Sequence, residues 1–283
     1  MPVTISTAVV RRRVRLDLRR HRENAGLNQR EAAEQSGLGA GHLAHFESGR
    51  NVPSDEAARK LFTTYGVRDE LDEFLALLVE ARRRTPSAAA ASDPEQFNLY
   101  AGLEQGASRI ESYEALVLHG LVQTEQYAEA LMRGHGQGLS EAEVRRRLRL
   151  RLRRQDVLTG DSPTRLWLLI KQHILAEPVG GPDVLRGQLE HLLKLSELPN
   201  VDIQMIRRDT VAYPALHTPF TIMQFDLPSD PGLVYIETRA KGLFFEETAE
   251  IQDYAQVMSH LRVLAAPQEE SAAIIDAMRK EIA

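Results

Sequence analysis

Seven arginines stand among ten consecutive residues, 145–154, of this 283-residue chain. On a helix, Val144, Leu148 and Leu152 would form one apolar stripe with the arginines around it. Guanidinium groups bind carboxylates and phosphates, so three interpretations are open. The segment is a helix with salt-bridged flanks, a contact with a DNA backbone, or an anion site for a nucleotide or an acidic protein face.

Polar residues that stand among apolar ones form a second candidate group. They are Glu114, Gln123, Tyr127, His173, Tyr235 and Glu237. Such residues line a ligand pocket, or they pair with one another in the core or in a dimer contact, because buried polar groups are normally hydrogen-bonded. For a possible effector, partner or anion site we select residues from both groups and the adjacent Gln155. The full set is Glu114, Gln123, Tyr127, Arg153, Arg154 and Gln155.

Patterns typical of catalysis are scarce. The chain has no cysteine, which excludes disulfides, thiol nucleophiles and cysteine-zinc sites. The part after residue 94 has no P-loop, no GxGxxG after a strand, no HExxH and no GxSxG. His173 and Glu177 are the nearest approach to a metal or acid–base pair, and two ligands without a third are a weak signal. We therefore expect no enzymatic activity, no metal site and no cofactor.

Charge is divided unevenly along the chain, whose formal net charge is -5. Residues 1–66 hold eleven Lys and Arg against seven Asp and Glu, and the remaining residues hold 24 against 33. The division predicts a basic part that faces phosphate and an acidic part that faces something else. Arginines between positions 11 and 20 place positive charge along one helix, and we assign Arg13 a phosphate contact. Solubility is the alternative reason for part of this charge.

The elements that must position these residues begin with a helical N-terminal part. Asn28 followed by Glu31 is a capping-box pattern, which marks a helix start. Gly26 and Gly37 stand where helices are expected to stop. The sequence predicts five short helices, near residues 9–25, 28–36, 40–48, 55–65 and 69–83.

The second and third of these helices have the spacing of a helix-turn-helix. Apolar residues recur so that one face of each helix is buried against the other, and small residues permit close approach at the tight turn. These residues are Ala32, Ala33, Leu38, Leu43 and Phe46. The opposite face of the third helix is then free to enter the major groove of DNA.

Residues 25–54 also resemble a helix-turn-helix of the lambda-repressor, or Xre, type. The matching positions are Gly26-Leu27-Asn28-Gln29, Ala33, Gly37, Glu47, Gly49 and Pro53. The resemblance implies phosphate contacts by Asn28, Gln29 and Arg50. It also implies a structural salt bridge between Arg22 and Glu47. Four residues would lie at the base edges: Ala40, Gly41, His42 and His45.

One departure from that family concerns the start of the third helix. Gly39-Ala40-Gly41 offers no side-chain hydrogen bonds where relatives place larger polar residues. Specificity would then rest on His42, His45 and DNA shape. The alternatives are that these histidines are exposed helix residues without a role, and that the N-terminal part is a protein-interaction module.

A second domain is expected beyond a linker of small residues and proline at 85–94. We assign residues 1–84 to the helix-turn-helix domain and 95–283 to a regulatory and dimerisation domain. The second domain is predicted to have helices at 96–133, 140–158, 182–197, 247–265 and 268–282, and strands at 165–170, 201–207, 220–226 and 233–237. The fold class is α+β, with a small antiparallel sheet and several helices.

The second domain resembles the C-terminal domain of actinobacterial (Streptomyces-type) antitoxin-like regulators. Tyr113-Glu114 and residues 119–124, which read HGLVQT, carry the resemblance. His119 and Val122 depart from the proline and leucine of that family. The resemblance implies a regulator that is often encoded beside a small partner protein.

Together these patterns predict a sequence-specific DNA-binding transcription regulator. We expect a dimer, because one helix-turn-helix reads about one half-site, and autoregulation is open. The expected partners are double-stranded DNA, a second copy of the chain, and a small adjacent-gene protein or a small-molecule effector. The alternative is an antitoxin-like protein whose main role is to neutralise a small partner. No apolar run reaches the roughly 20 residues of a membrane helix, and no signal peptide is evident, so we expect a cytoplasmic protein without membrane contact.

Overall fold

The computed structural model describes residues 6–83, 94–134, 138–210, 218–228, 230–239 and 241–282. The chain divides into two compact units, one of Met1–Ala88 with Phe97–Gly106 and one of Ala89–Gln96 with Ala107–Ala283. We call the first unit the head and the second unit the body. The described head is helical and the body combines a sheet with several helices, which confirms the predicted α+β class.

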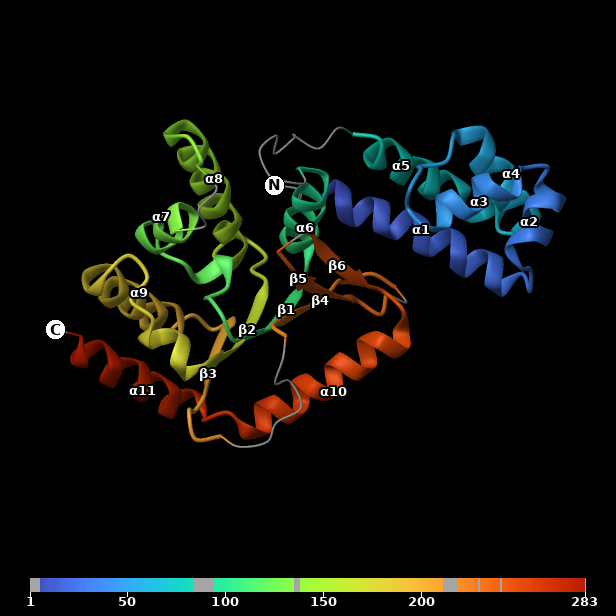
Figure 1. The fold of residues 1–283 in the computed structure, drawn as a ribbon. Helices are drawn as coiled ribbons and strands as arrows, with labels where there is room; N and C mark the ends of the chain where they lie inside the picture. The colour runs from blue at the N-terminus through green and yellow to red at the C-terminus, as the bar shows by residue number, and fades with distance from the viewer. Residues whose placement is uncertain are drawn as a thin grey trace. The chain divides into compact units, whose positions relative to one another are not determined.

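The described head consists of α-helices and one short 3-10 segment (Figure 1). The elements are α1 (Thr7–Asn24), α2 (Gln29–Ser36), α3 (Ala40–Glu47), α4 (Asp55–Tyr65), η1 (Arg68–Glu70), α5 (Leu71–Ala81) and α6 (Pro94–Gly106). The first five helices lie where the sequence predicts helices. The limits of α2 and α4 were predictable from local residues, because Asn28 and Ser54 cap their starts and Gly37 and Gly66 end them.

The limits of α2 illustrate this local control. Asn28 Oδ1 accepts a hydrogen bond from the Glu31 amide at 3.0 Å, and the Glu31 carboxylate accepts one from the Asn28 amide at 2.8 Å. The predicted capping box is therefore confirmed. At the other end Gly37 has a φ of 66°, a left-handed conformation that glycine adopts without strain and that ends the helix.

The core of the head is formed jointly by α1–α5. Ala32, Ala33 and Leu43 are buried, and Leu38 and Phe46 pack partly buried against the same cluster. The apolar face that the sequence predicts for the helix-turn-helix is therefore confirmed. The remaining core residues come from the helices on either side: Val10, Val14, Leu18, Ala58, Leu61, Phe62, Tyr65, Phe74, Leu78 and Ala81.

Helix α6 packs on α1 through two glycines. A Cβ atom on Gly102 would lie 2.9 Å from Ala8 Cβ, and one on Gly106 would lie 2.5 Å from Val9 Cγ2. Only glycine permits this close approach. The sequence assigns α6 to the second domain, whereas in the structure its residues from Phe97 onward group with the head. Residues 85–93 of the expected linker lie outside the described ranges, so the domain limits stay predictions.

The body is built on a six-stranded sheet in the order β3-β2-β1-β4-β5-β6. The strands are β1 (Arg109–Glu114), β2 (Arg165–Lys171), β3 (Val201–Ile206), β4 (Phe220–Gln224), β5 (Leu233–Glu237) and β6 (Gly242–Phe245). The helical elements are η2 (Gly120–Val122), α7 (Glu125–Gly134), α8 (Glu141–Arg154), η3 (Gln155–Leu158), η4 (Gln172–Ala176), α9 (Pro182–Leu195), α10 (Thr248–Leu264) and α11 (Gln268–Glu281).

The sheet is mixed, so the prediction of an antiparallel sheet is wrong for two of its five strand pairings. β1 pairs in parallel with β2, and β2 pairs in parallel with β3. β4, β5 and β6 extend the sheet from β1 with antiparallel pairing. Parallel neighbours require a crossover connection. Helices α7 and α8 provide it between β1 and β2, and α9 provides it between β2 and β3.

The prediction of one helix at 96–133 is wrong, because strand β1 lies within this range. The structure has α6, β1 and α7 in that range. The sequence of β1 contains Glu111 and Glu114, and glutamate is depleted in strands. However, β1 is hydrogen-bonded on both sides, to β2 and β4. Pairing with strands far along the chain therefore overrides the local pattern. Strand β6 was also not predicted.

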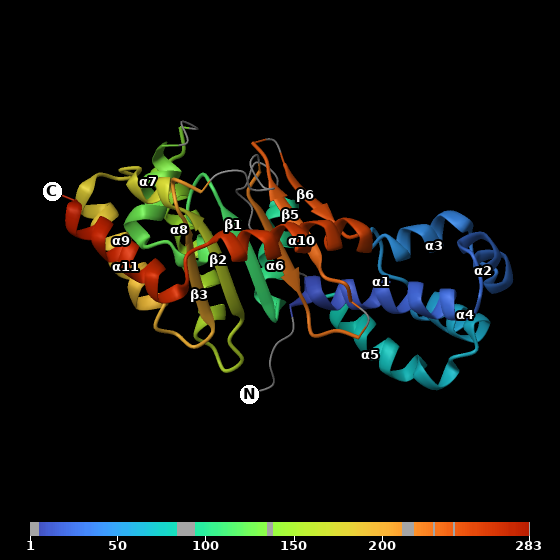
Figure 2. The same ribbon diagram turned by 90° about the horizontal axis from the view of Figure 1, so that it is seen from below.

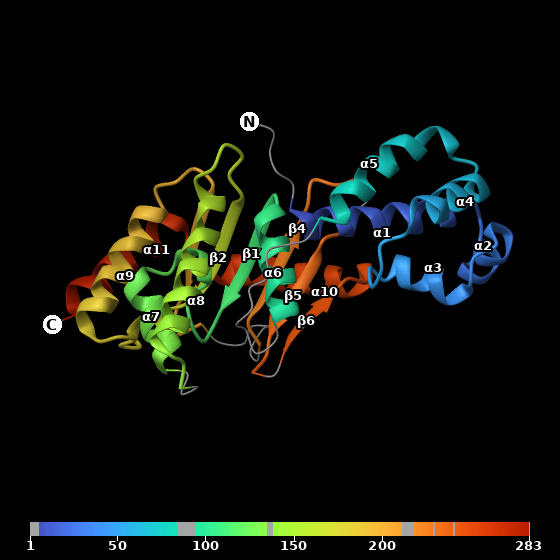
Figure 3. The ribbon, with the colours of Figure 1, turned by 90° about the horizontal axis from the view of Figure 1, so that it is seen from above.

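The two faces of the sheet are covered by different helices. Figures 2 and 3, which view the body from below and from above, show α10 on one face and α7 with α8 on the other. Tyr113, Phe220 and Val234 of the sheet share one core cluster with Ile251 and Met258 of α10. This burial fixes which side chains of each strand face α10.

The edge of the sheet at β3 is closed by the start of α11. The Met205 amide donates to Ser271 Oγ at 2.9 Å, and the Ala266 amide donates to the Met205 carbonyl at 2.9 Å. Gln204 Nε2 also donates to the Ala266 carbonyl at 3.0 Å. These contacts satisfy backbone groups that an open edge would leave free to pair with another chain.

Candidate nucleic-acid interface

Helix α3 has one buried side and one exposed side. Leu43 is fully buried in the head core, whereas Gly41 and His42 are exposed and His45 is half-buried. Ala40 begins the helix, and its side chain lies outside the described part of the structure. The exposed side carries ring nitrogens next to a glycine. It can therefore offer hydrogen bonds to base edges and also allow its backbone to approach closely.

The two histidines of α3 are held differently. The His42 ring stacks on Phe46, with ring centroids 6.5 Å apart and planes 20° apart. His45 Nε2 lies 3.2 Å from Arg50 Nη1. Arg50 is exposed, so the same guanidinium is accessible to a phosphate. Base reading by His42 and His45 and a phosphate contact by Arg50 stay predictions.

Asn28 and Gln29 lie at the exposed start of α2, where backbone N–H groups point outward. The Asn28 side chain caps the helix, and Gln29 Nε2 donates to Glu47 Oε2 at 2.8 Å. Both side chains therefore already have a partner within the head. A phosphate at this position would be bound by the helix terminus together with these side chains, and that contact stays a prediction.

A buried ion pair joins α1 to α3. Arg22 Nε lies 2.7 Å from Glu47 Oε1, and Arg22 Nη2 lies 3.0 Å from Glu47 Oε2. The two side chains are 10% and 4% exposed. Hydrogen bonding to Glu47 raises the pKa of Arg22. Because Gln29 binds the same carboxylate, Glu47 fixes α1, α2 and α3 relative to one another.

Arg13 lies on the side of α1 that faces α5. Its Nη2 is 2.6 Å from Glu73 Oε1, and its Nε is 3.5 Å from Asp17 Oδ2. Arg11 Nε similarly donates to the Ala81 carbonyl at 2.8 Å. These arginines therefore stabilise the packing of α5 on α1. A contact between Arg13 and phosphate would require its ion pair with Glu73 to open.

Two family models match the chain. One, described as a helix-turn-helix domain, matches residues 14–75 and so includes α2 and α3. The other, described as a domain of unknown function (DUF5753), matches residues 97–277, more than half of the chain. The chain belongs to the DUF5753 family. Neither the curated proteins nor the solved structures give a significant match.

The helix-turn-helix match agrees with the geometry of α2 and α3, and it identifies the head as a DNA-binding domain of a regulator. The DUF5753 match begins at Phe97, within α6. Its first helix therefore packs on α1 of the head, and its remaining elements form the body. The function of the DUF5753 part must be inferred from its own side chains.

A loop of the DUF5753 body is held by side chains that the sequence suggested for a ligand site. Gln123 Nε2 donates to the Leu118 carbonyl at 2.6 Å. Gln155 Nε2 donates to the carbonyls of Gly120 and Gln123 at 3.1 and 2.7 Å. Arg151 Nη1 donates to Gln123 Oε1 at 2.8 Å. Gln123 and Gln155 thus bind backbone. For Gln123 this is the satisfied-core alternative that the sequence left open.

Gln188 completes this loop and was missed by the sequence analysis. Its side chain accepts from the Thr124 amide and donates to the Val122 carbonyl, both at 2.7 Å, and it is fully buried. A signal was available, because Gln188 interrupts the apolar stripe of α9 between Leu185 and Leu189. A polar residue on a buried helix face requires a partner.

Glu114 lies in a different environment, at the end of β1. It is buried, and Ser112 Oγ donates to its carboxylate at 2.7 Å. Burial raises the pKa of Glu114 to about 7; the Ser112 hydrogen bond opposes the rise, and the nearby Glu237 adds to it. Ser112 Oγ also lies 2.8 Å from Thr221 Oγ1, a contact that sequence could not reveal. Glu114 therefore titrates near neutral pH within the fold.

The remaining residues of the second candidate group lie in different environments. Tyr127 is buried, and burial raises its pKa. Tyr235 is half-buried and Glu237 is exposed. His173 lies in the 3-10 segment η4, and Glu177 follows that segment in extended backbone. Since the segment is not α-helical, a spacing of four does not put His173 and Glu177 on one helix face.

Within the described ranges, no group of three or more His, Asp or Glu side chains could hold a metal ion. The same part of the chain contains no helix that combines the length and apolar character needed to cross a bilayer.

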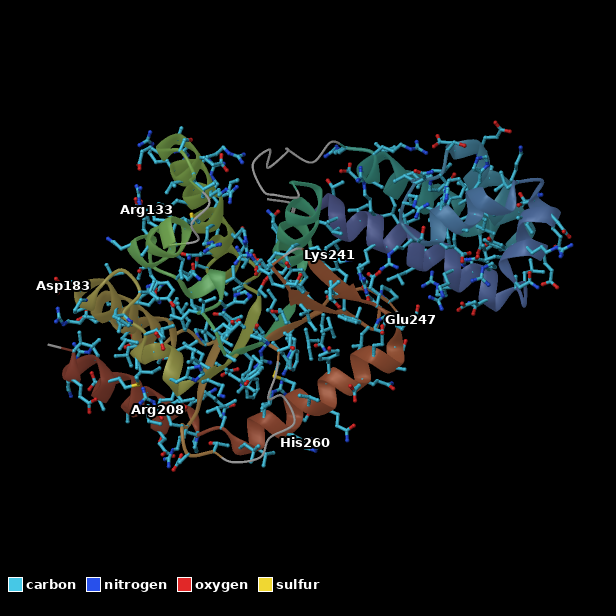
Figure 4. The ribbon with its side chains drawn as sticks, viewed as in Figure 1. Arg133, Asp183, Arg208, Lys241, Glu247 and His260 are labelled. Atoms are coloured by element: carbon cyan, nitrogen blue, oxygen red, sulfur yellow. The ribbon has the colours of Figure 1, made fainter. Side chains whose placement is uncertain are left out.

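The arginine-rich segment forms α8, as predicted. Val144 and Leu148 are buried, and Leu152 packs partly buried against Ala128 and Met132 of α7. The predicted apolar stripe is therefore confirmed. Arg154 approaches the loop after β1, and Arg153 is exposed. Figure 4 shows nitrogen-tipped side chains projecting from the outer side of this helix.

Proposed function

We propose that this DUF5753 protein is a sequence-specific DNA-binding transcription regulator of the Xre type. The supporting observation is the buried Glu47 carboxylate, which binds Arg22 of α1 and Gln29 of α2 at once. This contact holds the exposed side of α3 beside the exposed start of α2. With the two surfaces fixed in this way, α3 can enter the major groove while the start of α2 contacts a flanking phosphate.

The test is selection of duplexes from a random-sequence pool by the full chain, followed by binding to the selected duplex and to unrelated DNA. His42→Ala combined with His45→Ala should weaken binding to the selected duplex about tenfold or more, because one base contact contributes about 1–3 kcal/mol. Arg50→Ala should weaken both duplexes alike and lower the salt slope by about 1. Equal affinity for every sequence would contradict the proposal.

We further propose that the regulator acts as a dimer and that its body has a regulatory rather than a catalytic role. The general argument for the dimer is that a single helix-turn-helix reads one half-site with low affinity. The hydrogen bonds that tie Gln123 and Gln155 to the loop after β1 support a structural role for these residues. Light scattering across a concentration series tests the dimer, and a monomer at all concentrations would contradict it. Enrichment of the chain's own promoter tests autoregulation.

An antitoxin-like role is the second candidate, and one feature of the body favours it. Leu116 and Val117, which follow β1, are 72% and 40% exposed. Adjacent exposed apolar residues favour a protein contact over solvent. Co-expression with the protein encoded by the adjacent gene should give a complex that Leu116→Ser with Val117→Ser weakens. A complex that this variant retains in full would contradict a contact at the loop.

A further inference from the structure

The arginines of α8 fall into two groups with different surroundings. The first group has partners within α8 or in the loop after β1. Arg146 and Arg147 lie 3.1 and 2.6 Å from Glu143, and Arg151 binds Gln123. Arg154 belongs to this group as well, since its Nη2 lies 3.4 Å from the position of a Cβ on Gly120. The side chains of these arginines therefore already have contacts within the body.

The second group forms what we call the α8 arginine stripe, which consists of Arg145, Arg149 and Arg153. The three residues are exposed and follow one another at intervals of four. In an α-helix this interval keeps side chains on one face, about 6 Å apart along the axis. The stripe therefore presents three guanidinium groups in a row.

The positive charge of the stripe is only partly neutralised by neighbouring acids. Arg145 is 3.9 Å from Glu141, but Glu141 is bound more closely by Arg133, at 2.6 Å. Arg133 is labelled in Figure 4. Neither Arg149 nor Arg153 has an ion pair or hydrogen bond with any residue that the structure describes.

The sequence around the stripe adds to its positive charge, because acidic residues are scarce in α8. No Asp or Glu occurs between Glu143, in the first turn of α8, and Asp156, just beyond its end. The local potential along this face is therefore positive over most of the helix. Exposed guanidinium groups without internal partners are available to bind an external anion.

The composition of this face favours a nucleic acid over a protein. Protein interfaces are anchored by buried apolar and aromatic side chains, and their centres are depleted in charge. The exposed large apolar residues of the described chain are Val79, Leu99, Leu116, Val117, Val263 and Leu264, and none lies on α8. A phosphate backbone needs only a row of positive charges, because its affinity comes from counterion release.

We propose that the α8 arginine stripe binds the phosphate backbone of double-stranded DNA, independently of base sequence. The proposal rests on the DNA-binding function proposed above and extends it from the head to the DUF5753 body. The body would add backbone contacts to the base readings made by α3. Affinity would then depend on both domains, and specificity on the head alone.

The test uses the full chain and duplex DNA of unrelated sequence over a range of salt concentrations. Arg145→Gln, Arg149→Gln and Arg153→Gln are combined, because glutamine keeps helix propensity without the charge. Loss of three phosphate contacts should make the plot of log affinity against log salt less steep by about 2 to 3. The corresponding triple Lys variant should keep the wild-type slope, because it keeps the charge.

A matched control removes three exposed charges elsewhere on the body, through Arg165→Gln, Arg208→Gln and Arg239→Gln. This control should change the salt slope by less than 1. An equal change of slope in both triple Gln variants would show that the effect depends only on the net charge of the protein, and it would overturn the proposal. Circular dichroism of each variant confirms that the helix content is unchanged.

The outcomes separate this proposal from the function on which it rests. An unchanged slope in the stripe variant overturns the stripe and leaves the head's function intact, provided that the His42 and His45 variant still loses preference for the selected duplex. Absence of any duplex binding by the wild-type chain overturns both. Loss of binding to poly-glutamate with unchanged duplex binding would point to an acidic protein and overturn the DNA proposal.

Discussion

Two buried glutamates, Glu47 of the head and Glu114 of the body, are held in opposite ways. In the head, the buried Glu47 has Arg22 beside it, and Arg13 of the arginine-rich α1 is paired with Glu73. In the body, the buried Glu114 has a serine donor and lies near another carboxylate, while Arg149 and Arg153 of the α8 arginine stripe have no ion pair with any described residue. The difference teaches that local arginine content does not determine surface potential, because the neighbouring elements decide which charges are neutralised.

The contrast has a physical consequence for each domain. Pairing in the head makes its charges part of the fold, since a buried ion without its partner is strongly destabilising. In the body, Glu114 lacks a cationic partner and can take up a proton near neutral pH, and the exposed Arg149 and Arg153 keep their charge at the surface. Substitutions can test each side of this comparison.

The largest expected effect is that of Glu47→Ala in the head. It leaves the Arg22 guanidinium buried without its carboxylate and should lower the free energy of unfolding by about 3–5 kcal/mol. Hydrogen exchange of the α2 and α3 amides measures the loss within the head. Glu34→Ala is the matched control, because Glu34 and its partner Arg30 are exposed, and it should lose less than about 1 kcal/mol. Equal losses would remove the distinction between buried and exposed pairs.

Glu114→Gln in the body should raise the free energy of unfolding at high pH, whereas Glu47→Ala in the head lowers it. The folded-state pKa of about 7 lies above the ordinary value of 4.5, so the folded body binds the proton more tightly than the unfolded chain does. This contribution to stability is complete below pH 4.5 and is lost as the pH rises through about 7.

The glutamine side chain resembles the protonated acid at every pH. Above pH 7 the variant should therefore exceed the wild type in stability by about 3 kcal/mol, and the two should converge at low pH. Urea unfolding followed by Trp167 fluorescence across this pH range measures the difference. A Glu114→Gln variant that is less stable than the wild type at pH 8 would show that the ionised carboxylate is the stabilising form.

Gly106→Ala tests whether α6 is fixed to the head. The added Cβ would lie 2.5 Å from Val9 Cγ2, so the substitution should destabilise the α1–α6 contact by about 1–3 kcal/mol. Hydrogen exchange of the α6 amides reports the loss. Gly187→Ala, in α9, provides the control, because its Cβ meets nothing within 4 Å and should stabilise the helix by about 0.5–1 kcal/mol. Unchanged exchange in Gly106→Ala would show that α6 does not depend on this contact.

Asn28→Asp has the smallest expected effect on stability. Aspartate caps a helix as well as asparagine does, so the unfolding free energy should change by only a few tenths of a kcal/mol. If phosphate lies at the start of α2, the added negative charge should weaken DNA binding about tenfold or more. Fluorescence anisotropy with the selected duplex measures the affinity. Unchanged affinity would remove Asn28 from the interface and leave its capping role.

Sequence was a good guide wherever a local interaction sets the structure. The capping box at Asn28, the left-handed Gly37 and the apolar spacing of α2 and α3 all act within a few residues, and they predicted the helix-turn-helix. The apolar stripe of α8 was predictable for the same reason. The Arg22–Glu47 pair could be expected only from the resemblance to a family, because the two residues are far apart in sequence.

Contacts between distant segments decided the rest. β1 is a strand because β2 and β4 hydrogen-bond both of its sides, although it contains two glutamates, a residue type that is depleted in strands. The mixed sheet, the raised pKa of Glu114 and the binding of Gln123 and Gln155 to one loop also depend on residues brought together from far along the chain. By itself, the sequence determined the local elements and the helix-turn-helix. Only the tertiary structure decided which arginines and carboxylates have partners, because neutralising a charge requires a second residue within a few ångströms and chain order does not specify that distance.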